Sequence, residues 1–268
     1  MVESDDTFSG GKLGIGNGLS KLKMLNKQRI LLLSLYTFDI TGGVEKVCRA
    51  VMRTLTDLKN DDLIGDYLCF SMYDTKTNLR YSAAGHSKWF GGNRLNFGLG
   101  ATKKGLKCDI IILSHINLLL FGWLIKKLKP SARIILFAHG IEIWKPLKNW
   151  KKKFLKNKVE IWAVSHYTAA KINSQHSIPP HKIRILNNCL DPFFNVPETF
   201  KKPLELIERY GLGDDKKILF TLTRLSSDEK YKGYDQVMAV MKNLPGNRNL
   251  QVFFLVVAMS LTDALMLC

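Results

Sequence analysis

The stretch RILLLSLYTFDITGGVEKVCRAVMRTLTDL, residues 29–58, contains one complete strand–turn–helix pattern. Residues 29–36 are a continuous apolar run that is too short for a helix, which is typical of a buried strand. After Thr41-Gly42-Gly43, valine and leucine recur at helical spacing from Val44 to Leu58, with charged residues on the other faces. The stretch therefore predicts a strand, a glycine turn and an amphipathic helix.

The same alternation continues along the chain. Helix-like segments at 117–129 and 166–175 lie between apolar runs. These runs predict further strands over 64–73, 109–115, 132–140, 159–165, 181–188 and 216–224. Parallel neighbours need a crossover connection, so strands that alternate with helices predict βαβ units and a parallel sheet. The expected fold class is doubly wound α/β.

Composition divides the chain into three parts. Residues 1–27 are rich in Gly, Ser and Lys and predict a disordered leader. Residues 28–195 predict a Rossmann-like domain. Residues 196–268 predict a linker, a short helix near 203–210, the strand at 216–224, a helix at 234–243 and a strand at 252–257. This last part is too small for an independent core, because a lone βαβ unit leaves its sheet faces uncovered.

The net charge indicates which partners are expected, and the cysteines indicate the cellular compartment. Lys and Arg number 40 against 23 Asp and Glu, a net charge of +17 that favours a nucleotide, a nucleic acid or an anionic membrane surface. The five cysteines are scattered without a C-x-x-C pair, so a reducing, cytoplasmic location is expected, with neither a disulfide framework nor a zinc site. Acidic residues near the N-terminus argue against a signal peptide.

The sequence lacks the motifs of several common classes of catalytic and binding site. It has no H-E-x-x-H, no Walker lysine after a glycine loop and no G-x-S-x-G, so we expect neither a metal site nor a serine hydrolase. A nucleic-acid partner would rest on charge alone, since no RNA- or DNA-binding motif accompanies the lysines. We therefore expect no nucleic acid among the partners.

Candidate site residues follow the predicted strands. Gly42 and Gly43 would let the backbone approach a ligand at a helix N-terminus, although a tight turn without a ligand would use the same residues. His139 follows the strand at 132–140 and could contact a sugar hydroxyl or share a proton. His115 and Ser165 end neighbouring strands, so these three polar groups are expected to converge on one cleft.

The stretch TLTRLSSDEKYKGYD, residues 221–235, places cations after another predicted strand. Ligands collect outside the carboxyl ends of strands in open α/β sheets, and Arg224 and Lys232 could flank a pyrophosphate there. The alternative is a solvated basic loop.

Residues 144–158 carry seven lysines and no acid. Leu147, Trp150 and Phe154 recur at helical spacing, so this segment could lie on an anionic membrane. It could equally be a solvated helix that packs these apolar residues on its own sheet, and the sequence leaves both readings open.

Five motifs carry a family resemblance: TGGVEK, FAHG, AVSHYT, ILNNCLDPFF and TLTRLSSDEKYKGYD. In this order they resemble the family 4 retaining glycosyltransferases, from about Arg29 to Asn249. Such enzymes have the GT-B fold, in which two Rossmann-like domains bind a nucleotide-sugar between them. The resemblance implies a GT-B-like chain with a complete N-terminal Rossmann-like domain and the beginning of a second.

The resemblance also implies residue roles. Gly42 and Gly43 match the turn that approaches donor phosphate and acceptor, and His139 matches a histidine near the transferred sugar. Arg224 and Lys232 match the pair that neutralises the leaving diphosphate, so no metal or other cofactor is implied.

Three further positions match the family. Ser165 matches the serine that closes the following strand. Asn188 and Asp191 match an N-x-x-D at the interdomain edge, where Asn187 replaces a frequent proline.

The implied function is transfer of a sugar from a nucleoside-diphosphate-sugar to a hydroxyl of a glycan, lipid or small-molecule acceptor, with retention. The enzyme would be cytoplasmic, with a possible peripheral contact at the inner membrane face through 144–158. One departure stands against this. The family's E-x7-E is missing after the strand at 252–257, and Ala258 stands where its glycine turn would begin. The alternatives are a truncated glycosyltransferase, or an inactive α/β module that binds nucleotide weakly or pairs with another chain.

Overall fold

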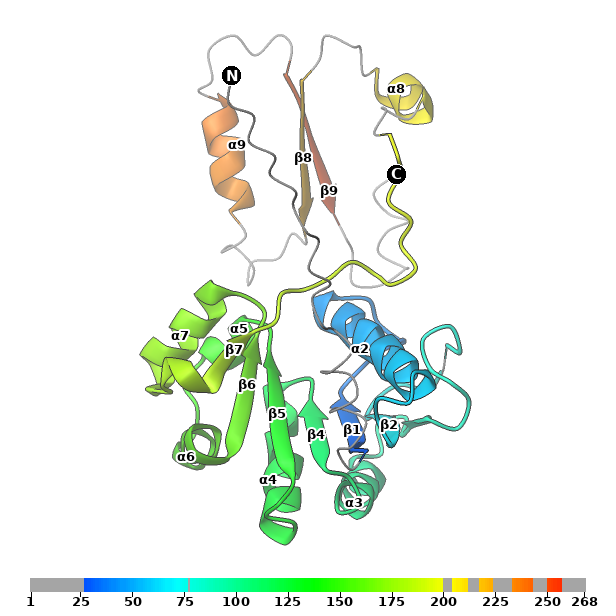
Figure 1. Cartoon of the computed structure of the whole chain (residues 1–268). Coiled ribbons are helices and arrows are strands. Elements are labelled where there is room, and N and C mark those ends of the chain that lie inside the picture. The colour runs from blue at the N-terminus through cyan, green and yellow to red at the C-terminus, as the bar shows by residue number, and fades with distance from the viewer. Residues whose placement is uncertain are drawn as a thin grey trace, which may run out of the picture. The chain divides into compact units, whose positions relative to one another are not determined.

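The computed structural model describes residues 27–76, 78–199, 204–211, 217–223, 233–242 and 250–256. The chain divides into two compact units, Met1–Phe194 and Asn195–Cys268 (Figure 1). The predicted disordered leader lies outside the described residues, apart from Lys27, so that prediction stays untested. No helix in the described ranges is long and apolar enough to span a membrane.

The described part of the N-terminal unit is built on a seven-stranded sheet in the order β3-β2-β1-β4-β5-β6-β7, and every pairing is parallel. The strands are β1 Arg29–Ser34, β2 Asp66–Ser71, β3 Ser87–Trp89, β4 Ile110–Leu113, β5 Arg133–Ala138, β6 Val159–Ala163 and β7 Ile183–Ile185. The strand order reverses between β1 and β4, which is where open α/β sheets bind ligands.

Helices cover both faces of this sheet. The segments are α2 Gly43–Asn60, α3 Arg94–Gly105, η1 Ile116–Leu118, α4 Leu119–Leu128, α5 Ile141–Trp144, α6 Asn149–Lys158, α7 His166–His176 and η2 Pro180–Lys182. Helix α2 packs on one face, and α3, α4, α6 and α7 contribute to the core on the other. The doubly wound α/β prediction is confirmed.

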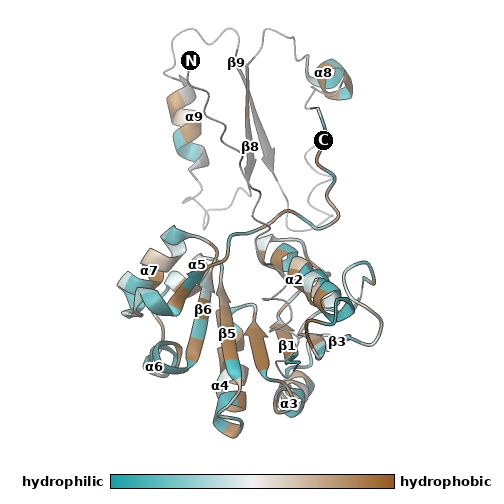
Figure 2. Ribbon diagram, viewed as in Figure 1, coloured by the Kyte–Doolittle hydropathy of each residue, from teal (hydrophilic) through white to brown (hydrophobic). Residues whose placement is uncertain are grey.

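The central strands are apolar on both sides because each side faces a core. Along β1, Leu31 and Leu33 belong to the core under α3 and α4, whereas Ile30 and Leu32 pack with α2. Figure 2 shows the strands of this unit mostly brown and the helices mixed brown and teal. Burial of each such side chain contributes about 1.5–3 kcal/mol, so the continuous apolar runs hold the sheet between its helical layers.

The predicted strands and helices of this unit are present, with ends that differ by a few residues. The elements that were missed are β3, α3 and the short α5 and η2. The α3 sequence RLNFGLGATKKG contains glycines that weaken a helical pattern. A Cβ atom at Gly98 would lie 3.0 Å from the Phe121 ring, so this glycine allows α3 to pack closely against α4. Packing against α4 therefore stabilises this helix, in addition to its N-cap Asn93, whose side chain accepts the N–H of Asn96 at 3.0 Å.

The described part of the C-terminal unit is one βαβ unit preceded by a helix. Its elements are α8 Leu204–Tyr210, β8 Lys217–Thr223, α9 Tyr234–Lys242 and β9 Leu250–Val256. Strands β8 and β9 pair in parallel, with Lys217 opposite Leu250. The predicted order of helix, strand, helix and strand is confirmed.

Candidate active site

Most of the predicted site residues share one edge of the N-terminal sheet. Strands β1, β4, β5, β6 and β7 are successive neighbours and run in parallel, so the residues that follow them lie at the same edge. The sheet thereby brings to this edge Gly42, Gly43, His115, His139, Ser165, Asn188 and Asp191. Arg224 and Lys232 lie outside the described residues.

A buried carboxylate orders the loop between β1 and α2. Asp74 is fully buried. Its Oδ2 accepts the backbone N–H of Thr37 at 2.7 Å, and its Oδ1 accepts those of Phe38 at 3.2 Å and Asp39 at 3.0 Å. Sequence reasoning missed this residue, although it follows a predicted strand. The carboxylate stabilises the loop that leads to Gly42-Gly43.

Arg49 holds the same loop from the helix side. Its Nε donates to the carbonyl of Thr37 at 2.7 Å, and its Nη2 donates to that of Ile40 at 3.2 Å. The loop is therefore fixed by a carboxylate through its N–H groups and by a guanidinium through its carbonyl groups.

The two glycines differ in their surroundings. Gly42 is the N-cap of α2 in an extended conformation, and a Cβ atom there would collide with the carboxylate of Glu45. A Cβ atom at Gly43 would meet nothing within 4 Å. Glu45 is favourably placed at the positive end of the helix. An anion that bound here would meet open backbone at Gly43 and would have to displace Glu45.

His139 has a fixed tautomer. Its Nε2 lies 3.0 Å from the carbonyl oxygen of Ser114, which can only accept, so Nε2 carries the proton. In the neutral ring Nδ1 is then an acceptor, and it has no hydrogen-bond partner among the described residues. The structure thus offers one unshared basic nitrogen at this edge.

Glu142 fixes the backbone around His139. Its Oε1 accepts the N–H of His139 at 2.6 Å and that of Gly140 at 3.0 Å. Gly140 has φ +156° and ψ −115°, a conformation that favours glycine and turns the chain from β5 into α5. Glu142, unlike His139 and Gly140, has no motif in the sequence that marks it as part of the site.

His115 lies in the same electrostatic environment. Its Nδ1 accepts the N–H of Asn117 at 3.0 Å. Burial lowers the pKa of His115, Glu142 raises it, and His139 and Lys151 lower it further. Burial likewise lowers the pKa of His139, against the opposing effects of Glu142 and the Ser114 carbonyl. Both imidazoles are therefore neutral at pH 7.

These pKa shifts predict that the N-terminal unit loses stability in mild acid. The unfolded chain takes up protons near the ordinary histidine pKa of about 6.5, whereas the folded chain does so only at lower pH. The stability that the two neutral histidines contribute is therefore complete above pH 6.5, and it is lost as the pH falls through their lowered pKa values. Urea denaturation followed by tryptophan fluorescence should show this loss, and the double variant His115→Gln, His139→Gln should lose less. An equal loss in both proteins would contradict the assignment.

Three of the predicted residues have other roles or surroundings. Ser165 caps α7, and its Oγ accepts the N–H of Thr168 at 3.1 Å. The Asp191 carboxylate accepts the Tyr81 hydroxyl at 2.5 Å, and this bond together with the Phe193 N–H lowers the pKa of Asp191. Asn188 is exposed. Ser165 and Asp191 thus make hydrogen bonds that stabilise the folded chain.

A hollow of about 320 Å³ lies between α2 and the sheet, and its lining is mainly apolar. His139 and Asn188 are among the polar residues that line it. The described residues include no group of three or more His, Cys, Asp or Glu side chains that could hold a metal ion.

One family of known proteins is similar to the N-terminal unit. Residues 68–193 match the model of Glycosyltransferase Family 4. A comparison with curated protein sequences gave no match.

Solved structures of similar fold include Alr3699/HepE from Anabaena in complex with UDP-glucose. It has a TM-score of 0.59 and 14% identity, over 89% of this chain and 64% of that one. The glycosyltransferase from Rickettsia africae ESF-5 has a TM-score of 0.51 and 16% identity, over 87% and 69% of the two chains. This chain thus spans less than two thirds of the first structure's length. Residues 68–193 are therefore similar to Glycosyltransferase Family 4, and the chain has the α/β fold of the GT-B glycosyltransferases.

Proposed function

We propose that this protein transfers a sugar from a nucleoside-diphosphate-sugar to a hydroxyl of a glycan, lipid or small-molecule acceptor, with retention of the anomeric configuration. The observation that carries the proposal is the common edge of β1 and β5. There an open glycine backbone at a helix N-terminus and a neutral histidine with an unshared nitrogen follow strands of one sheet. The HepE structures hold UDP-glucose, UDP and glucose, which is the donor chemistry proposed for this chain.

In the proposed donor site, different residues bind the diphosphate and the sugar. The backbone at Gly43 and the α2 N-terminus approach the diphosphate, where helix N–H groups and the dipole favour negative charge. Nδ1 of His139 accepts a hydrogen bond from a hydroxyl of the transferred sugar. Ser165, Asn188 and Asp191 stay proposed contacts at the same edge of the sheet.

The leaving group is the nucleoside diphosphate. Negative charge grows on it as the glycosidic bond breaks, so cations that bind it more tightly in the transition state accelerate the reaction. Arg224 and Lys232, in the segment that the structure does not describe, are the proposed cations. With them the reaction would need no metal, and the unpaired cysteines fit a cytoplasmic location.

Substitutions of increasing size at Gly43 test the proposed approach of the ligand. In Gly43→Ala, Gly43→Val and Gly43→Leu the free energy of unfolding is expected to change by no more than about 0.5 kcal/mol, because a Cβ atom there meets nothing within 4 Å and the residue is exposed. Transfer is expected to fall with side-chain size, by about tenfold or more for Leu, a loss of about 1.4 kcal/mol in transition-state binding.

The assay is release of nucleoside diphosphate from a panel of UDP-, GDP- and ADP-sugars, with the product anomer assigned by NMR. Equal activity across the Gly43 series would show that no ligand approaches this backbone. Nucleotide binding without turnover for every donor and acceptor would refute sugar transfer by this chain.

A further inference from the structure

Helices α4 and α6 pack beside each other and expose large apolar side chains. The exposed fractions are 53% for Leu120, 37% for Trp123, 55% for Leu128 and 38% for Trp150. By contrast, the exposed fraction of Phe154 is only 6%, and Leu147 packs against the core. Leu147 and Phe154 thus pack on the core of their own unit, as the second reading of residues 144–158 expected, whereas Trp150 remains exposed. The exposed surface combines two helices, and we call it the α4–α6 face.

A pair of tryptophans joins the two helices. The rings of Trp123 and Trp150 meet edge to face, with centroids 6.4 Å apart and planes at 67°. Lys127 Nζ lies 5.4 Å from the Trp123 centroid, and Lys151 Nζ lies 5.9 Å from the Trp150 centroid. Tryptophan beside lysine, with one part wet and one part apolar, is the combination found where proteins meet the polar boundary of a bilayer.

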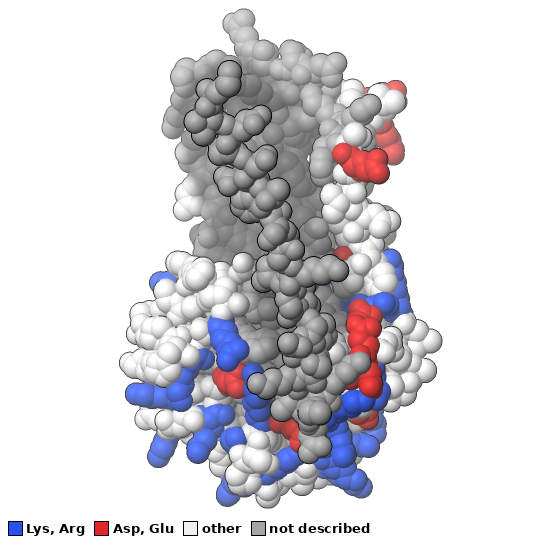
Figure 3. Space-filling model, viewed as in Figure 1, with Lys and Arg blue, Asp and Glu red and all other residues white. Residues whose placement is uncertain are grey.

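The charge on this part of the chain has one sign. Between residues 115 and 159 there are eleven Lys and Arg and a single acid, Glu142, which is hydrogen-bonded beside His139. Figure 3 shows blue side chains over the part of the N-terminal unit where α4 and α6 lie. Burial and the neighbouring Lys158 lower the pKa of Lys126. An anionic surface would relieve this repulsion between lysines.

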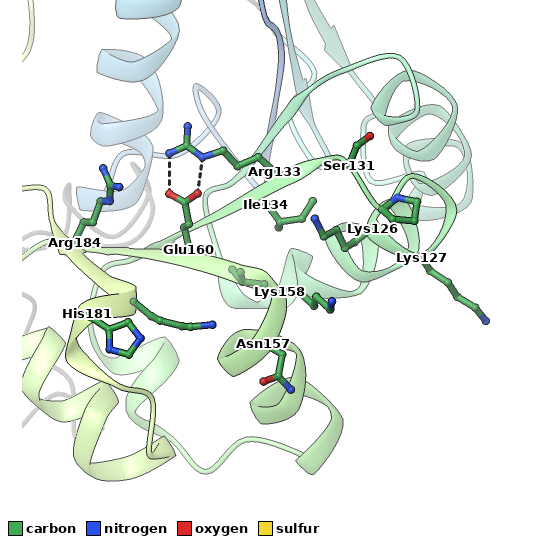
Figure 4. A pocket seen from close by; sticks show the side chains of 13 residues that line it. Lys126, Lys127, Ser131, Arg133, Ile134, Asn157, Lys158, Glu160, His181 and Arg184 are labelled. Carbon is green, nitrogen blue, oxygen red and sulfur yellow. Dashed lines mark hydrogen bonds and ion pairs between the residues drawn. The ribbon is translucent and has the colours of Figure 1, made fainter.

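A basic hollow continues the face toward the N-terminal ends of β5, β6 and β7 (Figure 4). It has a volume of about 860 Å³. Its cations are Lys126, Lys127, Arg133, Lys158, Lys182 and Arg184. Its one carboxylate, Glu160, is held by Arg133 through two hydrogen bonds of 2.5 and 2.7 Å. Lys158 and Arg184 donate no side-chain hydrogen bond within the described ranges, although Arg184 lies near enough to Glu160 to lower the pKa of that carboxylate.

We propose that the α4–α6 face docks on an anionic membrane surface, with its tryptophans and leucines in the boundary of the bilayer and the basic hollow over phosphate head groups. Charge complementarity selects an anionic partner, and the exposed Leu120 and Leu128 select a lipid one. Nucleic-acid grooves use aromatic faces for base stacking, whereas here lysines lie against both tryptophans. This surface is independent of the proposed sugar transfer.

Co-sedimentation of the full chain with vesicles tests the proposal. Binding is expected to vesicles that mix phosphatidylcholine with phosphatidylglycerol, to weaken with salt, and to be absent with phosphatidylcholine alone. Lys153 and Lys156 are exposed on α6. The double variant Lys153→Gln, Lys156→Gln should bind about 25-fold more weakly, at roughly fivefold for each lysine near the surface. Glutamine keeps the helix, because its propensity is close to that of lysine.

A matched control removes two exposed lysines at the far end of the sheet. Lys88 lies in β3 and Lys76 in the loop that follows β2, and both are exposed. The double variant Lys76→Gln, Lys88→Gln should bind as the unchanged protein does. Brominated lipid should quench the tryptophan fluorescence of the wild-type protein, and Trp123→Phe, Trp150→Phe should remove most of this quenching while it keeps binding. If both double lysine variants lost the same amount of vesicle binding, net charge alone would explain the binding and the proposal would be overturned. Duplex DNA that binds more tightly than the vesicles, and depends on Lys153 and Lys156, would also overturn it.

Discussion

Replacement of His139 by alanine is expected to lower kcat/KM for sugar transfer by about 10²- to 10⁴-fold, the range for a positioned group that shares a proton with a reacting or bound hydroxyl. The structure gives this ring one free acceptor, Nδ1, because Nε2 donates to the Ser114 carbonyl. The lowered pKa keeps the ring neutral, so the acceptor is present at pH 7. Initial rates with the preferred donor measure the effect.

Two conservative variants distinguish the roles of the two nitrogens of this ring. His139→Asn can place an oxygen near the position of Nδ1, and His139→Gln can place an N–H near that of Nε2. If Nδ1 contacts the sugar, Asn should recover part of the activity and Gln should not, whereas Gln should better preserve the free energy of unfolding. Greater activity in Gln than in Asn would show that His139 acts only through its contact with Ser114. Wild-type rates in both variants would place it outside the site.

Loss of the Asp74 carboxylate is expected to cost the N-terminal unit about 3–5 kcal/mol in Asp74→Ala, because three backbone N–H groups lose their acceptor in a buried place. The loop before Gly42-Gly43 would lose its order, so transfer should fall as well. Urea denaturation followed by tryptophan fluorescence reports on this unit specifically, since all five tryptophans lie between residues 89 and 162.

Asp39 provides the control for Asp74. Its carboxylate is exposed and accepts the N–H and hydroxyl of Thr75 at 2.8 and 2.9 Å. Asp39→Ala should cost less than about 1 kcal/mol, because water can replace an exposed acceptor. Asp74→Asn should fall between the two variants. A cost for Asp74→Ala no larger than that of Asp39→Ala would show that the loop is ordered by other contacts.

Much of the fold could be predicted from local pattern. A short apolar run followed by Gly42-Gly43 and a helical repeat fixes a strand, a turn and a helix, because each depends on neighbouring residues. Repetition of this unit fixes a parallel sheet. It also places His139 and Ser165 at the carboxyl edge of that sheet, since residues that follow parallel strands share one edge. The glycine-rich α3 was missed because its helical state depends on packing against α4.

The sequence by itself determined the class of fold and the edge at which the candidate site lies. Only the tertiary structure decided which distant residues meet there. Asp74 orders the loop of residues 37–39 because β2 pairs with β1, and Tyr81 holds Asp191 across 110 positions of sequence. Helical spacing likewise could not distinguish the buried Phe154 from the exposed Trp150, since the pattern shows which residues are apolar but not which of them another element covers. Strand order and helix packing make that choice, because they decide which local patterns lie against one another and which remain open to solvent.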